Sequence, residues 1–378
     1  MRRLSAFVLL PLFAAGLSAQ RRIDFEGRPA LVLENDRLEL TVLTDGGALA
    51  RIVLKEDPER LNPLWEPARL ARELGRPNRF GAGTGHFVCV DGFGGVSAEE
   101  RAAGLPGHGE AHRQRFEVLE AAPSAATLRA RLPIVQEVLT RTHRLVAGEN
   151  VVYVESELES LLGFDRPVAW AEHATIGAPF LAPEVTVVDL AAGPSETRPY
   201  PPEQAANRRL ASGREFTWPL APTRSGELVD LRAAPANPNL LDHTTTLLDP
   251  NRPTAFVTAL NLEKRLLIGY LFRREEFPWL QIWEYYPEGR TLARGLEFST
   301  QPYDVPRREA ISLGKMFGAP TYRWLPARSK IGARFLMFLA RVPEGFRKVD
   351  DVRLVGARLV IEDRVAGRRI ELAASRGL

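Results

Sequence analysis

The chain has 378 residues, with 50 Lys and Arg against 47 Asp and Glu, a formal net charge of +3 and one cysteine. A single cysteine excludes an intrachain disulfide framework, and interspersed charges of both signs do not form the one-sided basic surface typical of a nucleic-acid-binding protein. A chain of this length can bury a large core, in one domain or in two. We therefore expect a globular protein without a nucleic-acid partner.

Residues 1–19 have the pattern of a secretory signal peptide. Two arginines follow the first methionine, an apolar run extends over Ala6–Leu17, and small residues precede a plausible cleavage point after Ala19. The run is shorter than the about 20 apolar residues of a membrane-spanning helix; an uncleaved N-terminal anchor is the alternative. We expect a periplasmic or secreted mature chain, residues 20–378, with no membrane span.

Alternation of apolar and polar residues is the dominant local pattern. In Arg37–Leu43 it places Leu38, Leu40 and Val42 on one face of a strand. The turn-like Ala147–Asn150 separates two such runs and predicts a β-hairpin. The further predicted strands are Val138–Val146, Val152–Leu158, Thr254–Leu260, Leu266–Phe272, Leu280–Tyr286, Ile311–Met316, Ala333–Val342, Arg358–Asp363 and Arg369–Ala373.

Helix is scarce. Pro67–Leu74 is predicted to be helical because proline stands near its start and glycine follows its end. Asn78–Gly109 is rich in glycine, and Gly193–Pro253 is a long proline-rich stretch that we expect to pack on a sheet through Trp218. Many strands with short connections favour a sandwich or barrel. We predict an all-β fold, a large β-sandwich with few short helices, as a single domain over 20–378; two stacked β halves are the alternative.

Three titratable residues stand in settings that suit chemistry. Glycines flank His108, so a loop can bring its imidazole close to a ligand. His173 lies in a strand-like run with several polar groups. Glu297 lies between Leu296 and Phe298, and such an apolar setting raises the proton affinity of a carboxylate and suits it to act as a general base.

Each of these residues also has a structural interpretation. His173 could be a hydrogen-bonded core histidine, and Glu297 could pair with Arg294 or Arg307. A sugar-stacking platform is a further possibility, although one face of its strand is expected to be core. Its candidate aromatic residues are Trp279, Trp283, Tyr285 and Tyr286.

The sequence gives little sign of a metal or cofactor. His108 and His112 are four residues apart, as in a helical metal site, but the glycine after His108 argues against a helix. Cys89 lies between two valines and is most simply a small buried apolar residue. We expect no metal and no cofactor.

The order of these motifs resembles that of the galactose mutarotase-like (aldose 1-epimerase-like) proteins. Those proteins carry an Asn-Arg pair, a His-Gly motif, a second histidine on a strand and a glutamate in the last third of the chain. The corresponding residues of this sequence are Asn78-Arg79, His108-Gly109, His173 and Glu297. The family also has an acidic sugar-positioning residue before the glutamate, for which Asp242 and Asp249 are the nearest candidates.

The resemblance implies a fold and a set of roles. It implies a supersandwich fold and a sugar or oligosaccharide as partner, with Glu297 as base at the anomeric hydroxyl and His173 as acid at the ring oxygen. It implies that Asn78, Arg79, His108 and Asp242 bind the sugar. A non-catalytic carbohydrate-binding protein and a structural envelope protein are the alternatives.

Overall fold

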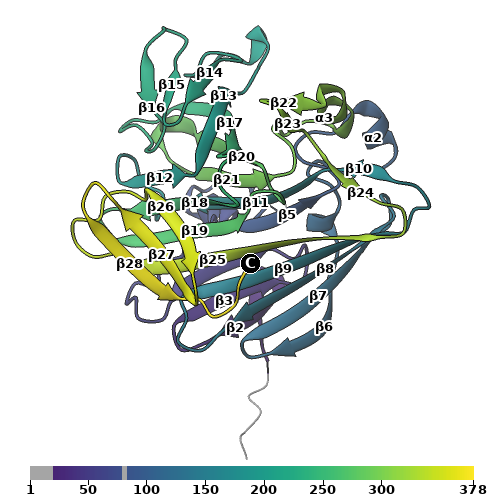
Figure 1. The fold of residues 1–378 in the computed structure, drawn as a ribbon, viewed down its shortest axis with the longest axis horizontal. Coiled ribbons are helices and arrows are strands. Elements are labelled where there is room, and N and C mark those ends of the chain that lie inside the picture. The colour runs from purple at the N-terminus through teal and green to yellow at the C-terminus, as the bar shows by residue number, and fades with distance from the viewer. Residues whose placement is uncertain (1–19, 79–82) are drawn as a thin grey trace, which may run out of the picture.

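The computed structural model describes residues 20–78 and 83–378, so the predicted signal peptide and Arg79 lie outside the described residues. The chain folds mainly into β-strands, and the all-β prediction is confirmed (Figure 1). Two large sheets dominate. In sheet order, the thirteen-stranded sheet consists of β1 (Arg21–Phe25), β2 (Arg28–Glu34), β3 (Leu38–Leu43), β4 (Leu49–Leu54), β5 (His86–Val90), β11 (Trp170–Gly177), β21 (Ala293–Ser299), β20 (Trp279–Tyr286), β17 (Leu240–Leu248), β13 (Ala192–Thr197), β14 (Glu215–Thr217), β15 (Leu220–Pro222) and β16 (Leu228–Asp230).

The second sheet packs against the first. In sheet order, its eight strands are β12 (Thr186–Leu190), β18 (Thr254–Asn261), β19 (Leu266–Arg273), β25 (Lys330–Arg341), β9 (Val151–Ser160), β8 (Glu137–Leu145), β7 (Ala125–Leu132) and β6 (Glu117–Ala122). The smaller sheets are β10 (Arg166–Val168) with β24 (Arg323–Leu325), β22 (Lys315–Met316) with β23 (Ala319–Pro320), and the C-terminal β26 (Asp351–Val355), β27 (Arg358–Asp363) and β28 (Arg368–Ala373). The predicted hairpins around 147–150 and at the C-terminus are confirmed.

The described helices are short. They are α1 (Pro67–Glu73), α2 (Ala98–Ala102) and α3 (Arg307–Leu313), with 3-10 turns at Ala111–Arg113, Pro202–Gln204 and Pro287–Gly289. The predicted helix at 67–74 is confirmed as α1. In the described part of the chain, no helix has the length and apolarity that crossing a membrane would require.

The two large sheets share one apolar core. Phe298 of β21 stacks on Phe272 of β19 with ring centroids 4.3 Å apart. One polar cluster lies inside this core: Arg141 of β8 donates to both oxygens of Glu172 of β11 at 3.1 and 3.0 Å, and Nε2 of His86 lies 2.8 Å from the same carboxylate. All three side chains are buried, so this cluster ties the sheets together through paired charges.

One prediction about local structure was wrong for most of its length. Most of the predicted strand 311–316 is not a strand: residues 311–313 belong to α3, Gly314 follows with a φ of +67°, which only glycine adopts readily, and only Lys315–Met316 form the short strand β22. The short apolar run fits strand and helix equally well, and both Ile311 and Leu313 are exposed. The proline-rich stretch 193–253 forms β13 to β17, and Trp218 packs against the main core, as expected; three of these strands have only three residues, too few to show alternation.

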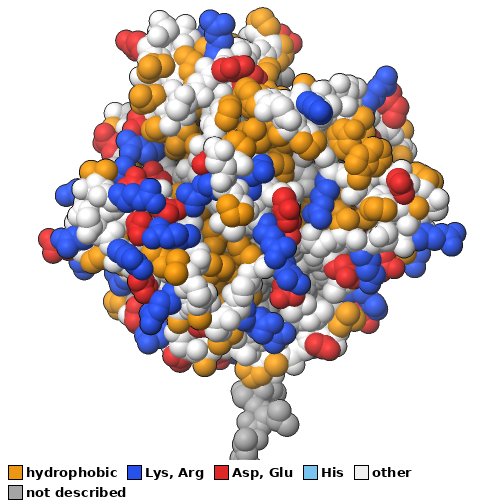
Figure 2. Space-filling model, in the orientation of Figure 1, with side chains coloured by type: hydrophobic (Ala, Val, Ile, Leu, Met, Phe, Trp, Pro, Cys, Tyr) orange, Lys and Arg blue, Asp and Glu red, His pale blue; other side chains and the backbone are white. Residues whose placement is uncertain are grey.

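The β13–β16 hairpins project from the body of the molecule (Figure 1). They have a small apolar cluster of their own, formed by Leu210, Ala221 and Leu231, with Trp218 packed against both this cluster and the main core. On the face shown in Figure 2, charges of both signs are mixed, and hydrophobic side chains gather between this projection and α3.

Candidate active site

Strand register brings the predicted acid and base together. β11 pairs with β21 so that His173 lies opposite Glu297, and with β5 so that His173 lies opposite Phe87. β20 continues the row, because Gln281 lies opposite Glu297. Since side chains directly opposite each other share a face of the sheet, these four residues form one row on the face turned away from the core.

The row holds His173 in a defined position. Its Nε2 lies 3.3 Å from Oε1 of Glu297, and its Nδ1 lies 2.9 Å from the hydroxyl of Thr175. The ring of Phe87 stacks on the imidazole with centroids 4.3 Å apart and an interplanar angle of 20°. Both ring nitrogens thus have neighbours, and Nε2 is the one that meets the carboxyl group.

Glu297 is not the structural ion-pair partner that its neighbours in sequence allow. Arg294 lies on the opposite face of β21, 3.7 Å from Glu284, and Arg307 pairs with other carboxylates. Room for the Glu297 side chain comes from Gly295, where a Cβ would lie 2.1 Å from Oε1. The missing side chain two residues earlier on the same face therefore sets where the carboxyl group lies.

His108 reaches the same face from a loop. Its φ is +65°, and a Cβ on the following Gly109 would lie 2.0 Å from the carbonyl oxygen of Val90, so glycine is required there. Nδ1 of His108 accepts a hydrogen bond from the backbone N–H of Gly94 at 3.3 Å, which places the proton of the neutral ring on Nε2. The imidazole centroid lies 5.2 Å from that of His173.

Burial shifts the pKa values of the two central residues, Glu297 and His173, in opposite directions. Burial raises the pKa of Glu297 well above its usual value, and the nearby negative charge of Asp304 adds to this. Burial lowers the pKa of His173 well below its usual value, with a further contribution from His108. The pair therefore holds one proton over a wide range of pH, either on the carboxyl group or on the imidazole.

Further residues of the site were not predicted. His243 of β17 lies on the same face as Glu297, and its Nδ1 is 3.5 Å from Oδ1 of Asp304. Arg198 binds the same oxygen at 2.7 Å. Gln281 is fully buried, and neither of its amide atoms makes a well-formed hydrogen bond with a described residue. Nε2 of His243 is likewise buried without such a partner.

Asp242 does not join this site. It lies on the core face of β17, where Arg209 pairs with it at 3.1 Å and the backbone N–H groups of Arg209 and Leu210 donate to it. Because neighbouring residues of a strand face opposite ways, it is the adjacent His243 that faces the site. The prediction was thus one residue away from the side chain that the fold presents.

Asn78 lies beside the site rather than in it. It lines a neighbouring cavity together with Trp65 and Tyr285. Trp283 connects the two places, since its ring lies 6.3 Å from that of His173 and 5.6 Å from that of Tyr285. Of the aromatic residues considered as a platform, Trp283 and Tyr285 are half-buried on this face, whereas Trp279 and Tyr286 are fully buried.

The histidines do not form a metal-ligand set within the described residues, where no group of three or more His, Cys, Asp or Glu is arranged to hold a metal ion. The rings of His108 and His112 have centroids 6.3 Å apart and are nearly perpendicular. Burial, with His108 nearby, lowers the pKa of His112 to about 3, so its imidazole is neutral near pH 7. Cys89 is buried, as predicted, and its Sγ lies 3.5 Å from Nδ1 of His108.

Comparison with known proteins identifies the fold. No protein-family model and no curated protein sequence matches the chain. A provisionally named aldose 1-epimerase from Klebsiella pneumoniae subsp. pneumoniae matches with a TM-score of 0.59 and 14% identity over 83% of this chain and 80% of that chain. The galactose mutarotase related enzyme from Lactobacillus acidophilus matches with a TM-score of 0.57 and 14% identity over 86% and 100%. A galactose mutarotase-like protein from Lactobacillus casei matches with a TM-score of 0.56 and 16% identity over 82% and 100%.

The chain therefore has the galactose mutarotase-like fold, and the resemblance seen in its motifs is confirmed at that level. Identities of this size show the fold alone. What the site does has to be argued from its own residues.

Proposed function

We propose that this protein binds a sugar at the His173–Glu297 pair and exchanges its anomers there, as an aldose 1-epimerase-like enzyme. The observation that carries the proposal is the 3.3 Å contact between a buried imidazole and a buried carboxyl group whose pKa values shift in opposite directions. Anomer exchange needs two such groups at one acetal carbon, one to take a proton and one to give it.

The reaction starts from the form of the pair in which its single proton has moved to Nε2 of His173 and Glu297 is a carboxylate. Glu297 takes the proton from the anomeric hydroxyl O1 while His173 gives a proton to the ring oxygen O5. The C1–O5 bond breaks, and an open-chain aldehyde forms. Rotation about C1–C2 followed by closure produces the other anomer, and the reverse proton transfers restore the pair. His108, with the proton on Nε2 when neutral, acts as a hydrogen-bond donor to the sugar.

The surrounding polar groups support a sugar as ligand. Neither amide atom of Gln281 makes a well-formed hydrogen bond with a described residue, so hydroxyl groups that bind this buried amide would stabilise it. Asp304 and His243 add an acceptor and a second imidazole on the same face. These groups offer donors and acceptors with little net charge, which suits a neutral ligand rich in hydroxyl groups.

The proposal is tested by NMR exchange or polarimetry on freshly dissolved α-anomers of glucose and galactose. We expect the protein to accelerate exchange and His173→Asn to reduce the acceleration by about 10²–10⁴-fold, because each proton transfer is needed for ring opening. A thermal melt shows whether the variant is folded. An exchange rate in folded His173→Asn equal to that of the wild type would refute the assignment.

The second candidate is a non-catalytic carbohydrate-binding protein. The buried amide of Gln281 and Nε2 of His243, which make no well-formed hydrogen bond with a described residue, favour it, because they would bind sugar hydroxyls whether or not chemistry follows. Binding of sugars by calorimetry, without exchange of any anomer tried, would favour this candidate.

The proposal includes a location outside the cytoplasm, in the periplasm or the medium. Its support is the order of positive start, short apolar run and small residues before Ala19. Mass spectrometry of the protein from its native envelope should find a chain that begins after Ala19. An intact Met1, or recovery from the cytosol, would refute export with cleavage.

A further inference from the structure

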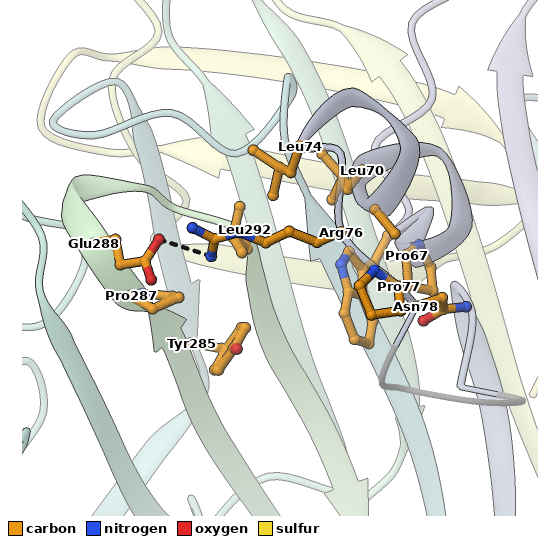
Figure 3. Close-up of a pocket in the computed structure, with 12 residues that line it drawn as sticks. Pro67, Leu70, Leu74, Arg76, Pro77, Asn78, Tyr285, Pro287, Glu288 and Leu292 are labelled. Carbon is orange, nitrogen blue, oxygen red and sulfur yellow. Dashed lines mark ion pairs between the residues drawn. The ribbon is translucent and has the colours of Figure 1, made fainter.

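A second cavity lies beside the His173–Glu297 pair. Its volume is about 450 Å³, which is within the range of small-molecule sites. One wall comes from α1 and residues 76–78, and the other from the end of β20 and the turn that follows (Figure 3). The lining is largely aromatic and aliphatic: Trp65, Leu70, Leu74, Tyr285, Pro287 and Leu292.

Aromatic rings lead from the active site into this cavity. Trp283 lies 6.3 Å from the ring of His173, and it stacks on Tyr285 with centroids 5.6 Å apart and an interplanar angle of 18°. Trp65 meets Trp283 edge-on at 6.1 Å. Along β20, the four steps from Gln281 to Tyr285 span about 13 Å, enough for a second sugar ring beside the first.

The cavity is polar at its rim and close to neutral. Arg76 and Glu288 come from opposite walls and form a 2.8 Å ion pair (Figure 3). Arg76 is the one cation among the described lining residues and Glu288 the one anion, so their charges cancel. A charge-neutral pair of this kind binds hydroxyl groups through its donors and acceptors but offers no net charge to a phosphate or a uronic acid.

We propose that this cavity is a subsite for the second ring of a reducing oligosaccharide, bound by stacking on Tyr285 and by hydrogen bonds at the Arg76–Glu288 pair. This inference rests on the proposed function of the His173–Glu297 pair. Anomer exchange requires a free hydroxyl at C1, so the second ring is attached through another hydroxyl of the reducing-end sugar. Aromatic faces suit the C–H surfaces of a pyranose, while its hydroxyls face the polar rim.

The test compares anomer exchange of reducing disaccharides (maltose, cellobiose and lactose) with that of glucose and galactose. For the preferred disaccharide, we expect kcat/KM to exceed that of its reducing-end monosaccharide by about 5- to 10-fold, from one additional ring-stacking contact. Tyr285→Ala should remove that preference and leave the monosaccharide rate unchanged. Tyr285→Phe should retain it, because it keeps the aromatic face.

Tyr322→Ala is the matched control. Tyr322 is also a partly buried tyrosine with an aromatic neighbour, Trp324 at 5.7 Å, but it does not line the cavity. The Tyr322→Ala variant should keep the preference for the disaccharide. Equal kcat/KM for all disaccharides and their monosaccharides, or equal loss for both substrates in Tyr285→Ala, would overturn the subsite while leaving the proposed catalysis in place.

If the wild type exchanges no anomers, the proposed catalysis is refuted, but the subsite can still be tested by calorimetry. A disaccharide that binds more tightly than its monosaccharide, with the difference lost in Tyr285→Ala, would support it. Equal affinities would overturn it.

Discussion

Replacing Glu297 by Gln isolates the role of one carboxyl group with little change of shape. The side chain of Glu297 is fully buried, contacts His173 at 3.3 Å, and is not paired with Arg294 or Arg307. The amide of Gln fills the same space beside Gly295 and keeps a hydrogen-bonding group toward the imidazole. The substitution therefore removes the proton acceptor without breaking an arginine ion pair.

The expected loss is that of one acid–base group. Anomer exchange should fall by about 10²–10⁴-fold, which corresponds to about 3–5 kcal/mol of transition-state stabilisation. Sugar affinity should change little, because Gln281, His243 and His108 remain in place. The assay is NMR exchange of α-glucose or α-galactose beside calorimetric binding.

The same variant should be more stable than the wild type at neutral and alkaline pH. Burial raises the pKa of Glu297 in the folded protein above its unfolded value, so the folded state keeps the proton that the unfolded state releases. The stability of the wild type therefore falls as pH rises from about 4.5 toward the folded pKa. Gln resembles the protonated carboxyl group and does not lose this stability, so thermal melts should separate the two proteins increasingly with pH.

Glu284→Gln is the matched control. Glu284 is an equally buried strand glutamate, but it lies on the core face, 3.2 Å from Arg209 and 3.7 Å from Arg294. Its loss should lower stability and leave exchange by the folded protein within a fewfold of wild type. If Glu297→Gln instead melts lower at every pH and exchanges anomers normally when folded, the carboxyl group is structural and the base assignment is wrong.

Three further outcomes follow from the same geometry. Gly295→Ala should cut exchange by about 10²-fold with little change in melting temperature, because its Cβ would lie 2.1 Å from Oε1 of Glu297 and only that flexible side chain has to move; unchanged kinetics would contradict this. The rate of exchange should have a broad plateau against pH: it falls at acid pH when His173 takes a second proton below its lowered pKa, and at alkaline pH when the pair loses its last proton above the raised pKa of Glu297. A rate that falls across pH 6–7, as for an unshifted histidine, would be inconsistent with the buried pair. Arg141→Met should destabilise the fold by about 3–5 kcal/mol in urea unfolding, because it leaves the buried carboxylate of Glu172 without its cation; a loss below 1 kcal/mol would show that the pair is dispensable.

Much of the fold could be predicted because its strands are long enough to show alternation. The hairpin at 147–150 and helix α1 carry clear local signals. α2 was missed although Ser97 and Glu100 form a capping box, a signal that the sequence does contain. The three-residue strands β14 to β16 carry no such signal, since their pairing depends on hairpin contacts and not on periodicity.

The site was predicted where motif order reflects the fold. His108, His173 and Glu297 do come together, from a loop and two neighbouring strands. Asp304 and Gln281 could not be assigned, because their place beside Glu297 depends on register across strands distant in sequence. Asp242, predicted to bind the sugar, faces the core instead for a related reason: a strand's composition does not state which of its faces is the core.

Glu172 and His173 are neighbours on β11 and therefore face opposite sides of the sheet. The register of β11 against β5 and β21 decides which of the two side chains faces the candidate active site. A slip of one residue would turn the Glu172 carboxylate toward the ligand and the imidazole into the core. Arg141 would then face no carboxylate in an interior where an unpaired charge is unfavourable. The buried Arg141–Glu172 pair thus favours a single register of β11, and in that register the imidazole of His173 faces the proposed sugar site.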